Sequence, residues 1–461
     1  MLAPLETLTQ LQARVAELAD QLPWTRDGGL ASLILELPAP PKGIPDIGGP
    51  MFHLEHPHKR TLRAGFGMAA EYRAQGPGCL ERLRSQLRPA LADWWRLDPD
   101  DTGFDAFAWI GFAATLDSAE TPAGATPPAL CWVPEIGLQC LDGQCVLVLS
   151  TRLPASRDGT LARWLEQLAR LVPALALPAP GPLTPACLRR GEELPERGDW
   201  DKLVGEALQA IDDGVLTKVV AARRLRLVSE RRLDAGRLAT ALTYLFPSCQ
   251  MLRWRFDDAA FVAATPERLL SLRGRRVEVD ALAGTAGRAA PAARDAELAE
   301  ALLASAKDRH EHDLVVRDIV DSLAPISASL QVPDQPGLLQ LTNAQHLWTP
   351  VFATLREDDD VLGLAQRLHP TPAVNGVPRI AARTWLNDRE PFARGWYTGA
   401  AGWVGPDLGG DLWVLLRCAE LSGHRADLYA GAGLVAGSDA ASEWQETEDK
   451  FAAMLTALQF A

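Results

Sequence analysis

Two ionisable residues in the second half of the chain stand where acid–base chemistry could use them. Lys218 lies inside the apolar, β-branched run 215–228, where loss of hydration would favour its neutral amine and suit it to act as a general base. Glu267 follows Pro266, which ends regular strand pairing and lets the carboxylate project from a sheet edge as a proton donor. Each also has a simpler interpretation, a lysine whose end reaches water and a turn glutamate paired with Arg268.

Two further carboxylates, Glu311 and Glu446, lie on separate predicted helices. Carboxylates that come from two helices, with few soft ligands nearby, give the oxygen-rich arrangement that Mg²⁺ takes, with substrate and water completing its shell. For either helix alone, a solvated charged face is the simpler explanation. His310 and His312 are two residues apart on a helix and cannot point the same way, so the pair does not indicate zinc.

Arg417 and the glycines Gly431 and Gly433 are of types that bind anions. An arginine fork suits a carboxylate, and glycines let backbone N–H groups approach an anion closely. The glycine run follows a predicted hairpin and does not open a strand–helix–strand unit, so it does not indicate dinucleotide binding. Arg417 itself is expected on a strand over residues 411–421.

The elements that position these residues follow from apolar spacing and turn residues. Strands arrive in runs and do not alternate strictly with helices, which favours an α+β fold with large antiparallel sheets. The spacing predicts helices over residues 200–213, 296–323 and 442–458, a strand over 215–228, and strand pairs over 269–279, turning near Gly274, and over 412–434, turning at Ser422 and Gly423.

The first part of the chain carries predicted elements but no chemical constellation. Apolar spacing predicts an amphipathic helix at the N-terminus, helical structure over 79–95 and a strand over 145–153. The segment 171–185 contains five prolines, which remove backbone donors and exclude a helix or a central strand. We expect residues 1–190 to be an N-terminal scaffold within the same α+β unit and residues 191–461 to be the catalytic region.

Composition bounds the class of protein. The chain has 461 residues and a formal net charge of −13, so its overall field repels nucleic acid and anionic membrane surfaces. Its longest apolar runs stay below the roughly 18 residues needed to span a bilayer. The seven cysteines are scattered, with no Cys-x-x-Cys pair, and suggest neither a disulfide framework nor a zinc site. These features favour a protein of a reducing cytoplasm.

In chain order, these segments together resemble the chorismate-utilising enzymes from about residue 200 to residue 458. Ten strings in sequence order make the resemblance specific. They are Lys218–Arg223, Thr265–Arg268, Ala281–Thr285, Ser305–His312, Gln345–Leu347, Leu368–Gly376, Arg394–Gly399, Leu416–Arg417, Gly431–Val435 and Ser442–Lys450.

Particular positions favour one branch of that family. Members that add water carry a lysine where Lys218 stands, whereas members that add ammonia carry glutamine there. Aminodeoxychorismate synthases typically have a nucleophilic lysine where this chain has Ala283, which cannot form a covalent adduct. Isochorismate synthase is the best match, because salicylate synthases tend to lack the His369–Val374 form of the later loop. Salicylate synthase, which goes on to eliminate pyruvate, is the alternative.

The resemblance implies a fold, a site and partners. The fold is two large antiparallel sheets packed face to face with helices outside. Water would attack C2 of chorismate with Lys218 as base and Glu267 as acid, and Mg²⁺ would be the cofactor. The product would enter menaquinone, siderophore or salicylate synthesis, among which the sequence does not choose, and the protein would be a monomer without an amidotransferase subunit. The implied substrate contacts are Gly284, Thr285, His346, Tyr397, Arg417, Gly431, Gly433 and Lys450, and the implied metal ligands are Glu311 and Glu446.

Overall fold

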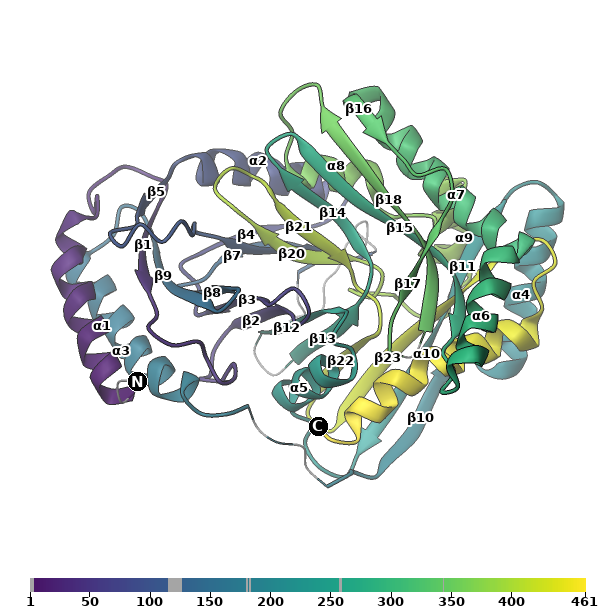
Figure 1. Ribbon diagram of the computed structural model, residues 1–461, viewed down its shortest axis with the longest axis horizontal. Helices are drawn as coiled ribbons and strands as arrows, with labels where there is room; N and C mark the ends of the chain where they lie inside the picture. The colour runs from purple at the N-terminus through teal and green to yellow at the C-terminus, as the bar shows by residue number, and fades with distance from the viewer. Residues whose placement is uncertain (1–3, 115–126, 180, 182–183, 257–258, 343) are drawn as a thin grey trace.

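The strands of the chain pair almost entirely antiparallel and form two large sheets (Figure 1). We describe a computed structural model in residues 4–114, 127–179, 181, 184–256, 259–342 and 344–461. Within these residues one sheet has 13 strands and the other has 10. Helices cover the outer surfaces, so the predicted α+β class of two packed antiparallel sheets is confirmed.

The larger sheet contains strands from both ends of the chain. Its only parallel neighbours in the described residues are β1 and β5. In spatial order its strands are β10 (Leu188–Leu194), β11 (Lys218–Ser229), β23 (Arg425–Leu434), β22 (Cys418–Ser422), β13 (Ala259–Thr265), β12 (Gln250–Phe256), β2 (Met51–His56), β3 (Thr61–Phe66), β8 (Ile136–Leu141), β9 (Gln144–Arg152), β1 (Leu30–Glu36) and β5 (Trp94–Leu97), and the short β19 (Gly376–Val377) pairs with β11.

The smaller sheet is also built from both halves of the sequence. Its strands, in spatial order, are β16 (Ser327–Gln331), β18 (Ala344–Leu355), β15 (Arg276–Gly287), β14 (Arg268–Arg273), β21 (Gly410–Val414), β20 (Ala400–Val404), β6 (Ala108–Phe112), β7 (Ala129–Val133) and β4 (Ala70–Ala74), and β17 (Gly337–Gln340) pairs with β18.

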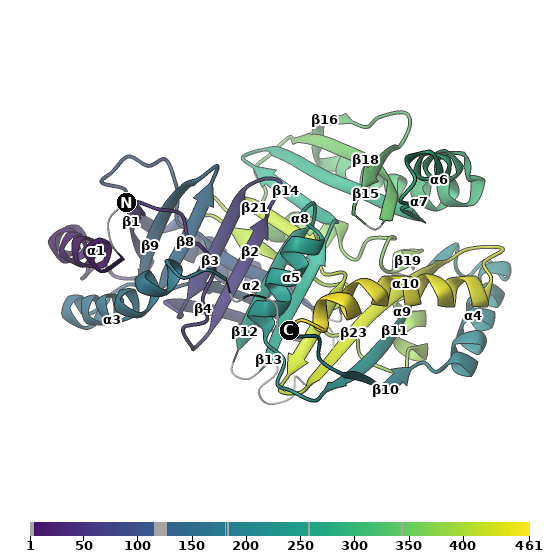
Figure 2. The same ribbon diagram turned by 60° about the horizontal axis from the view of Figure 1, so that its bottom comes forward.

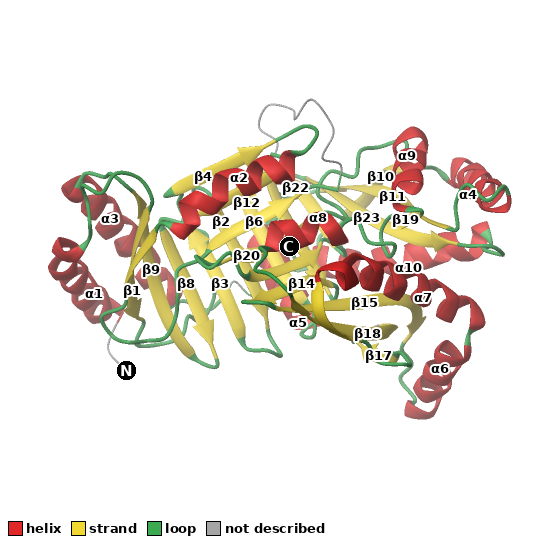
Figure 3. Ribbon diagram, turned by 90° about the horizontal axis from the view of Figure 1, so that it is seen from above, coloured by secondary structure: helices red, strands yellow, loops and turns green. Residues whose placement is uncertain are grey.

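The helices lie around the two sheets, with α1 and α3 at one end and α4, α6 and α9 at the other (Figure 3). They are α1 (Pro4–Leu18), α2 (Cys79–Ala92), α3 (Arg157–Leu175), α4 (Arg197–Asp212), α5 (Ala235–Leu245), α6 (Ala292–Ala304), α7 (Ala306–Leu323), α8 (Val361–Leu368), α9 (Arg379–Arg389) and α10 (Ala440–Leu458), with 3-10 turns at Ala19–Gln21 and Ala324–Ile326. No helix in the described part of the chain is long and apolar enough to cross a membrane.

A large apolar core joins the facing surfaces of the two sheets. It includes Trp109 and Trp132 of the smaller sheet and Trp254 of the larger one, whose rings lie 5.2–6.0 Å apart in successive contacts. A second cluster lies under α5 and α10 and contains Leu242, Phe451 and other buried residues. These aromatic and aliphatic surfaces supply most of the hydrophobic stabilisation that holds the layers together.

The two sheets separate towards one end of the molecule. Figure 2 shows β14, β15 and β18 with α6 and α7 as one layer, and β11 and β23 with α4 and α10 as another. Ser305 separates α6 from α7 in the first of these layers. Its hydroxyl accepts a hydrogen bond from the Asp308 N–H and so caps the N-terminus of α7. The predicted continuous helix over 296–323 is therefore wrong: Ser305 divides it into α6 and α7.

Three other local predictions differ from the structure. The helix α3 continues through Pro173 to Leu175, so the first residues of the proline-rich segment are helical; residues 180 and 182–183 of that segment lie outside the described residues. Leu412 belongs to β21 of the smaller sheet, not to the hairpin that turns at residues 422–423. Arg417 lies between β21 and β22 with a φ of 47°, not on a strand.

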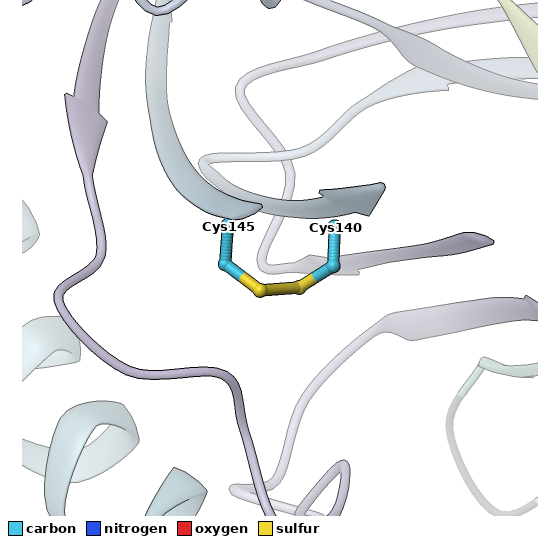
Figure 4. The surroundings of a disulfide bond; sticks show 2 residues. All are labelled: Cys140 and Cys145. Atoms are coloured by element: carbon cyan, nitrogen blue, oxygen red, sulfur yellow. A yellow bond between two sulfur atoms is a disulfide. The ribbon is translucent and has the colours of Figure 1, made fainter. Parts of the chain in front are cut away.

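The structure also joins Cys140 to Cys145 in a disulfide, which the cysteine spacing did not predict (Figure 4). The two residues face each other across the β8–β9 hairpin, with their Cα atoms 4.2 Å apart. Cysteine spacing alone does not reveal this bond, because it depends on the pairing of β8 with β9. Cys131, Cys187, Cys249 and Cys418 are not disulfide-bonded.

Candidate active site

A cavity of about 600 Å³ opens between the two layers and gathers nearly every residue that the sequence marked. Its walls come from the loop after β13, from β11, β15, β18 and β23, from α7 and α10, and from the loops at residues 373–374, 397 and 416–417. Of the predicted site residues, those that line it are Glu267, Gly284, Thr285, Glu311, His346, Tyr397, Arg417, Gly431, Gly433, Glu446 and Lys450.

Lys218 lies directly behind this lining, as the first residue of β11. The side chain is fully buried, and its Nζ is 2.8 Å from Oε1 of Glu311, which lines the cavity. The angles of this contact fall short of a hydrogen bond, and Nζ has no other hydrogen-bond partner among the described residues. A buried amine with unused donors next to a cavity is a group that a bound molecule could engage.

Glu267 follows β13 and faces the same cavity. It is 5% exposed, and burial raises its pKa from 4.5 to about 8, although the Lys218 charge and a hydrogen bond from Thr371 oppose the rise. The Thr371 hydroxyl donates to Oε1 at 3.5 Å. At neutral pH the carboxyl therefore carries its proton, which is the state that a general acid requires.

The acidic residues of α7 and α10 converge on one wall of the cavity. Glu311 contacts Lys218, and Glu446 Oε1 accepts a hydrogen bond of 2.7 Å from Lys450. Although burial opposes the shift, Lys450 lowers the pKa of Glu446 and keeps it ionised. One turn earlier on α10, Glu443 is 2% exposed and contacts Lys307 at 3.0 Å.

These carboxylates fit a hard divalent cation that also binds a substrate. In the residues that the structure covers, no three His, Cys, Asp or Glu side chains form a complete metal site. Glu311 and Glu446 nevertheless face one cavity, and each has an ammonium group as its present partner. One or two carboxylates, with water and substrate oxygens, are the donor set that Mg²⁺ takes.

The glycines of β23 are required because side chains of the cavity approach this strand closely. A Cβ at Gly433 would lie 2.5 Å from Oε1 of Glu311 and 3.3 Å from Cε of Lys218. A Cβ at Gly431 would lie 2.8 Å from the Tyr397 hydroxyl. The glycines thus let the strand approach these three side chains, which a side chain at either position would displace.

The wall opposite β23 is formed by an irregularity in β15. The register of β15 with β18 shifts between Ala283 and Thr285, so Gly284 is an extra residue with a φ of 76°. Such β-bulges redirect side chains and occur next to active sites. Here the bulge places Gly284 and Thr285 on the cavity, beside Asp308 at the start of α7.

Thr285, His346 and Arg417 form a connected polar chain. His346 Nδ1 is 3.0 Å from the Thr285 hydroxyl, and its Nε2 is 3.1 Å from an Arg417 terminal nitrogen. Because a guanidinium can only donate, Nε2 must accept and Nδ1 carries the proton. Desolvation and the charges of Arg417 and Lys450 lower the pKa of His346 to about 3, which keeps the ring neutral. The histidine therefore orients Arg417.

Two tyrosines complete the cavity, and only one was predicted. Tyr397 is 2% exposed and stacks on Tyr429, with ring centroids 5.2 Å apart and planes 12° apart. Both rings line the cavity, as do Val220 and Ala373. Tyr429 carried no sequence signal, since an aromatic residue in a β-strand usually marks a core position. Ala373 lines the cavity and Thr371 donates to Glu267. Both belong to the string 368–376, so the resemblance could have marked them as site residues.

The fold and the residues of this cavity point to one family of enzymes. The family model described as "Chorismate binding enzyme" matches residues 42–459, and the chain belongs to that family. This confirms the resemblance inferred from the motifs.

Relatives within the family are similar in sequence and in structure. The chain is 42% identical over 264 residues to the "Salicylate biosynthesis isochorismate synthase" of Pseudomonas aeruginosa, an alignment covering 57% of this chain and 55% of that protein. It is 35% identical over 309 residues to "Isochorismate synthase MenF" of Escherichia coli K12, an alignment that covers 67% of this chain and 71% of that protein.

The solved structure of the menaquinone-specific isochorismate synthase MenF from Escherichia coli matches with a TM-score of 0.82 at 27% identity, over 98% of this chain and 100% of that one. Anthranilate synthase component I of Streptococcus pneumoniae, at 21% identity and a TM-score of 0.69, shares the fold.

Proposed function

We propose that this protein is an isochorismate synthase, an isomerase that adds water at C2 of chorismate and releases the hydroxyl at C4. The observation that carries the proposal is the presence of a buried lysine and a buried, protonated glutamate at one cavity that also holds two carboxylates. The names of the relatives support it, and they do not favour the salicylate synthase alternative.

Lys218 and Glu267 divide the proton transfers of the reaction between them. As water forms its bond to C2, Lys218 takes a proton from it, both ring double bonds shift by one position, and the C4–oxygen bond breaks. Glu267 gives its proton to the departing hydroxyl, so one water enters and one leaves. A positioned acid or base of this kind contributes typically about 10²–10⁴-fold in rate.

The remaining cavity residues hold and orient the substrate in this proposal. Arg417 and Tyr397 bind the enolpyruvyl carboxylate, and the neutral His346 fixes the guanidinium in place. Backbone N–H groups near Gly431 and Gly433, and the Lys450 ammonium, add positive potential at the same wall. Gly284 and Thr285 line the ring. The net charge of −13 makes these local cations necessary for a dianionic substrate.

Mg²⁺ is the proposed cofactor, with Glu311 and Glu446 as the residues that would hold it. When bound, the ion neutralises part of the charge of the ring carboxylate. Glu311 would then exchange its contact with Lys218 for one with the cation, and Glu446 would do the same with Lys450. Lys218 would thereby lose its counter-ion before it acts as a base.

Incubation with chorismate and Mg²⁺, followed by separation of the products, tests the proposed function. The expected product is isochorismate without stoichiometric pyruvate. Release of pyruvate with fluorescent salicylate would establish the lyase alternative, and a product that changes on addition of ammonia would indicate an aminating enzyme. No turnover at saturating Mg²⁺ would mean that the protein only binds chorismate or another ligand.

A metal titration tests the ligand role of Glu446. We expect Glu446→Gln to raise the Mg²⁺ concentration for half-maximal activity by at least about tenfold, because an amide is a weaker ligand than a carboxylate. Glu448→Gln, two residues further on the same helix, is the matched control and should leave the titration unchanged. An unchanged titration for Glu446→Gln would reject the assignment.

A further inference from the structure

The strand that carries Lys218 lacks a strand partner along part of one edge. β11 pairs with β23 on one side. On the other side β19 pairs with residues 218–219, and β10 pairs from Arg224 onwards. Between them, residues 220–223 have no strand neighbour on that edge in the described part of the chain. Buried backbone groups without partners would be costly, so something else must satisfy them.

An ion pair takes the place of the missing strand. The Ala222 N–H donates to Oε1 of Glu390 at 3.0 Å, and Arg394 donates to the Val220 carbonyl at 2.6 Å. Arg394 and Glu390 bind each other through two hydrogen bonds of 2.6 and 2.7 Å. Their side chains are only 8% and 4% exposed. The pair therefore holds β11 two and four residues beyond Lys218.

The same guanidinium reaches two other walls of the cavity. It donates to the Val374 carbonyl at 2.7 Å and to the Thr398 hydroxyl at 3.4 Å, and the Arg394 carbonyl accepts from the Tyr397 N–H at 3.0 Å. A guanidinium has five N–H donors. Its two hydrogen bonds to Glu390 and its single bonds to the other three partners, Val220, Val374 and Thr398, use one donor each. A lysine has three donors and no planar fork, so it could not replace it.

We propose that Arg394, held by Glu390, is a positioning residue for the reaction, an inference that rests on the proposed function. It acts through Val220, Val374 and Tyr397, which all line the cavity. By tying β11 to the loop before β19 and to the turn that presents Tyr397, it sets where the base lies relative to the substrate. Displacements of about 1 Å in such an arrangement can cost about 10²-fold in rate.

A second cavity gives small molecules access to the pair. It has a volume of about 450 Å³ and is lined by Arg394, Glu390 and Asn387, among others. Because it reaches the guanidinium, a variant that lacks the side chain should admit free guanidinium ion in its place.

The test compares Arg394→Ala with Arg226→Ala. Arg226 is on the same strand and makes a bidentate pair with Asp427 of β23, at 2.7 and 2.8 Å, away from the cavity. Both variants are assayed well below their unfolding temperatures. We expect Arg394→Ala to lower kcat and raise KM, with kcat/KM down by at least about 100-fold, and Arg226→Ala to change each less than about threefold. Guanidinium chloride at tens of millimolar should raise the kcat/KM of Arg394→Ala at least about tenfold above its value without guanidinium. Sodium chloride at the same concentration should not.

Values of kcat and KM within about threefold of the parent in folded Arg394→Ala would overturn the proposal and leave the pair a purely structural contact. If Arg394→Ala does not fold, Glu390→Gln and Arg394→Lys decide: each should lose at least about tenfold in kcat/KM, and parental values would contradict the proposal. Hydrogen exchange at Ala222 should also be faster in these variants. That readout is independent of turnover, so a parent protein inactive on chorismate would refute the proposed function without deciding the role of Arg394.

Discussion

Among single residues, Lys218 is the one on which the proposed reaction depends most, because its amine is the base. We expect Lys218→Ala to reduce kcat by at least about 100-fold, because no other described lysine is fully buried at this cavity and a general base typically contributes about 10²–10⁴-fold. Lys202→Ala, at a lysine 76% exposed on α4, is the control and should behave like the parent. Steady-state assays with chorismate measure both. Turnover of Lys218→Ala within about tenfold of the parent would place the base elsewhere.

Glu267 gives the reaction a pH dependence whose direction follows from its burial. Because the pKa of the carboxyl is raised from 4.5 to about 8, the acid is protonated at neutral pH and loses its proton above about pH 8. We therefore expect kcat/KM to fall as the pH rises through about 8, and this limb to be absent from the residual activity of Glu267→Gln. A pH–rate profile that stays flat to pH 9 would contradict the role of Glu267.

The same burial predicts that Glu267 costs stability. The folded state keeps a proton that the unfolded chain loses near pH 4.5, so stability falls as pH rises from about 4.5 to about 8, by ~1.4 kcal/mol per pH unit. Glu267→Gln is neutral throughout and escapes this loss. Its melting temperature relative to the parent should therefore increase between pH 5 and pH 8. A difference that does not change with pH would mean that the carboxyl is not desolvated as described.

At the scale of elements, close approach of β23 to α7 sets the spacing of the site. We expect Gly433→Ala to fold but to lose at least about 100-fold in kcat/KM, because its Cβ would meet the Glu311 carboxylate at 2.5 Å. Gly337→Ala is a matched control on β17, where the nearest atom would be 3.8 Å away. Circular dichroism and kinetics measure both variants. Near-parental activity of Gly433→Ala would show that α7 can move away freely.

Sequence periodicity located most of these elements, and it failed where local chemistry interrupts a pattern. The helix at 442–458 was predicted within two residues, and the turn near Gly274 was predicted correctly, although β15 continues to Gly287, beyond the predicted end at residue 279. Ser305 was interpreted as part of one long helix because its capping hydrogen bond depends on a backbone turn that spacing does not reveal. The bulge at Gly284 was likewise invisible, since it exists only in the register between β15 and β18.

The candidate site was predictable in its residue types but not in its contacts. Motif order brought Lys218, Glu267, Glu311 and Glu446 together. In the structure the three glutamates line one cavity, and Lys218 lies behind its lining in contact with Glu311. The contact of Lys218 with Glu311 joins residues from a strand and a helix far apart in the chain. No spacing rule relates such positions, so only the fold could show that the candidate base and a candidate metal ligand share an ion pair.

At the scale of the whole molecule, the N-terminal residues are inseparable from the sheets. β12 pairs with β2 in the larger sheet, and β20 pairs with β6 in the smaller. In a fragment of residues 191–461, the edges of β12 and β20 would lack their partners. The core residues that pack against residues 1–190 would also be exposed. We expect this fragment to aggregate or to lack cooperative unfolding, as measured by size exclusion and thermal denaturation beside the full chain. A soluble fragment that unfolds cooperatively would show that residues 1–190 are dispensable for folding.

Running the reaction with chorismate and Mg²⁺ in water enriched in ¹⁸O tests whether solvent supplies the hydroxyl at C2. If Lys218 activates water for attack at C2, mass spectrometry of the isolated isochorismate will show one solvent oxygen per molecule, located at C2. Isochorismate that retains only the original oxygens of chorismate would contradict the account, because the hydroxyl would then have migrated without a solvent nucleophile.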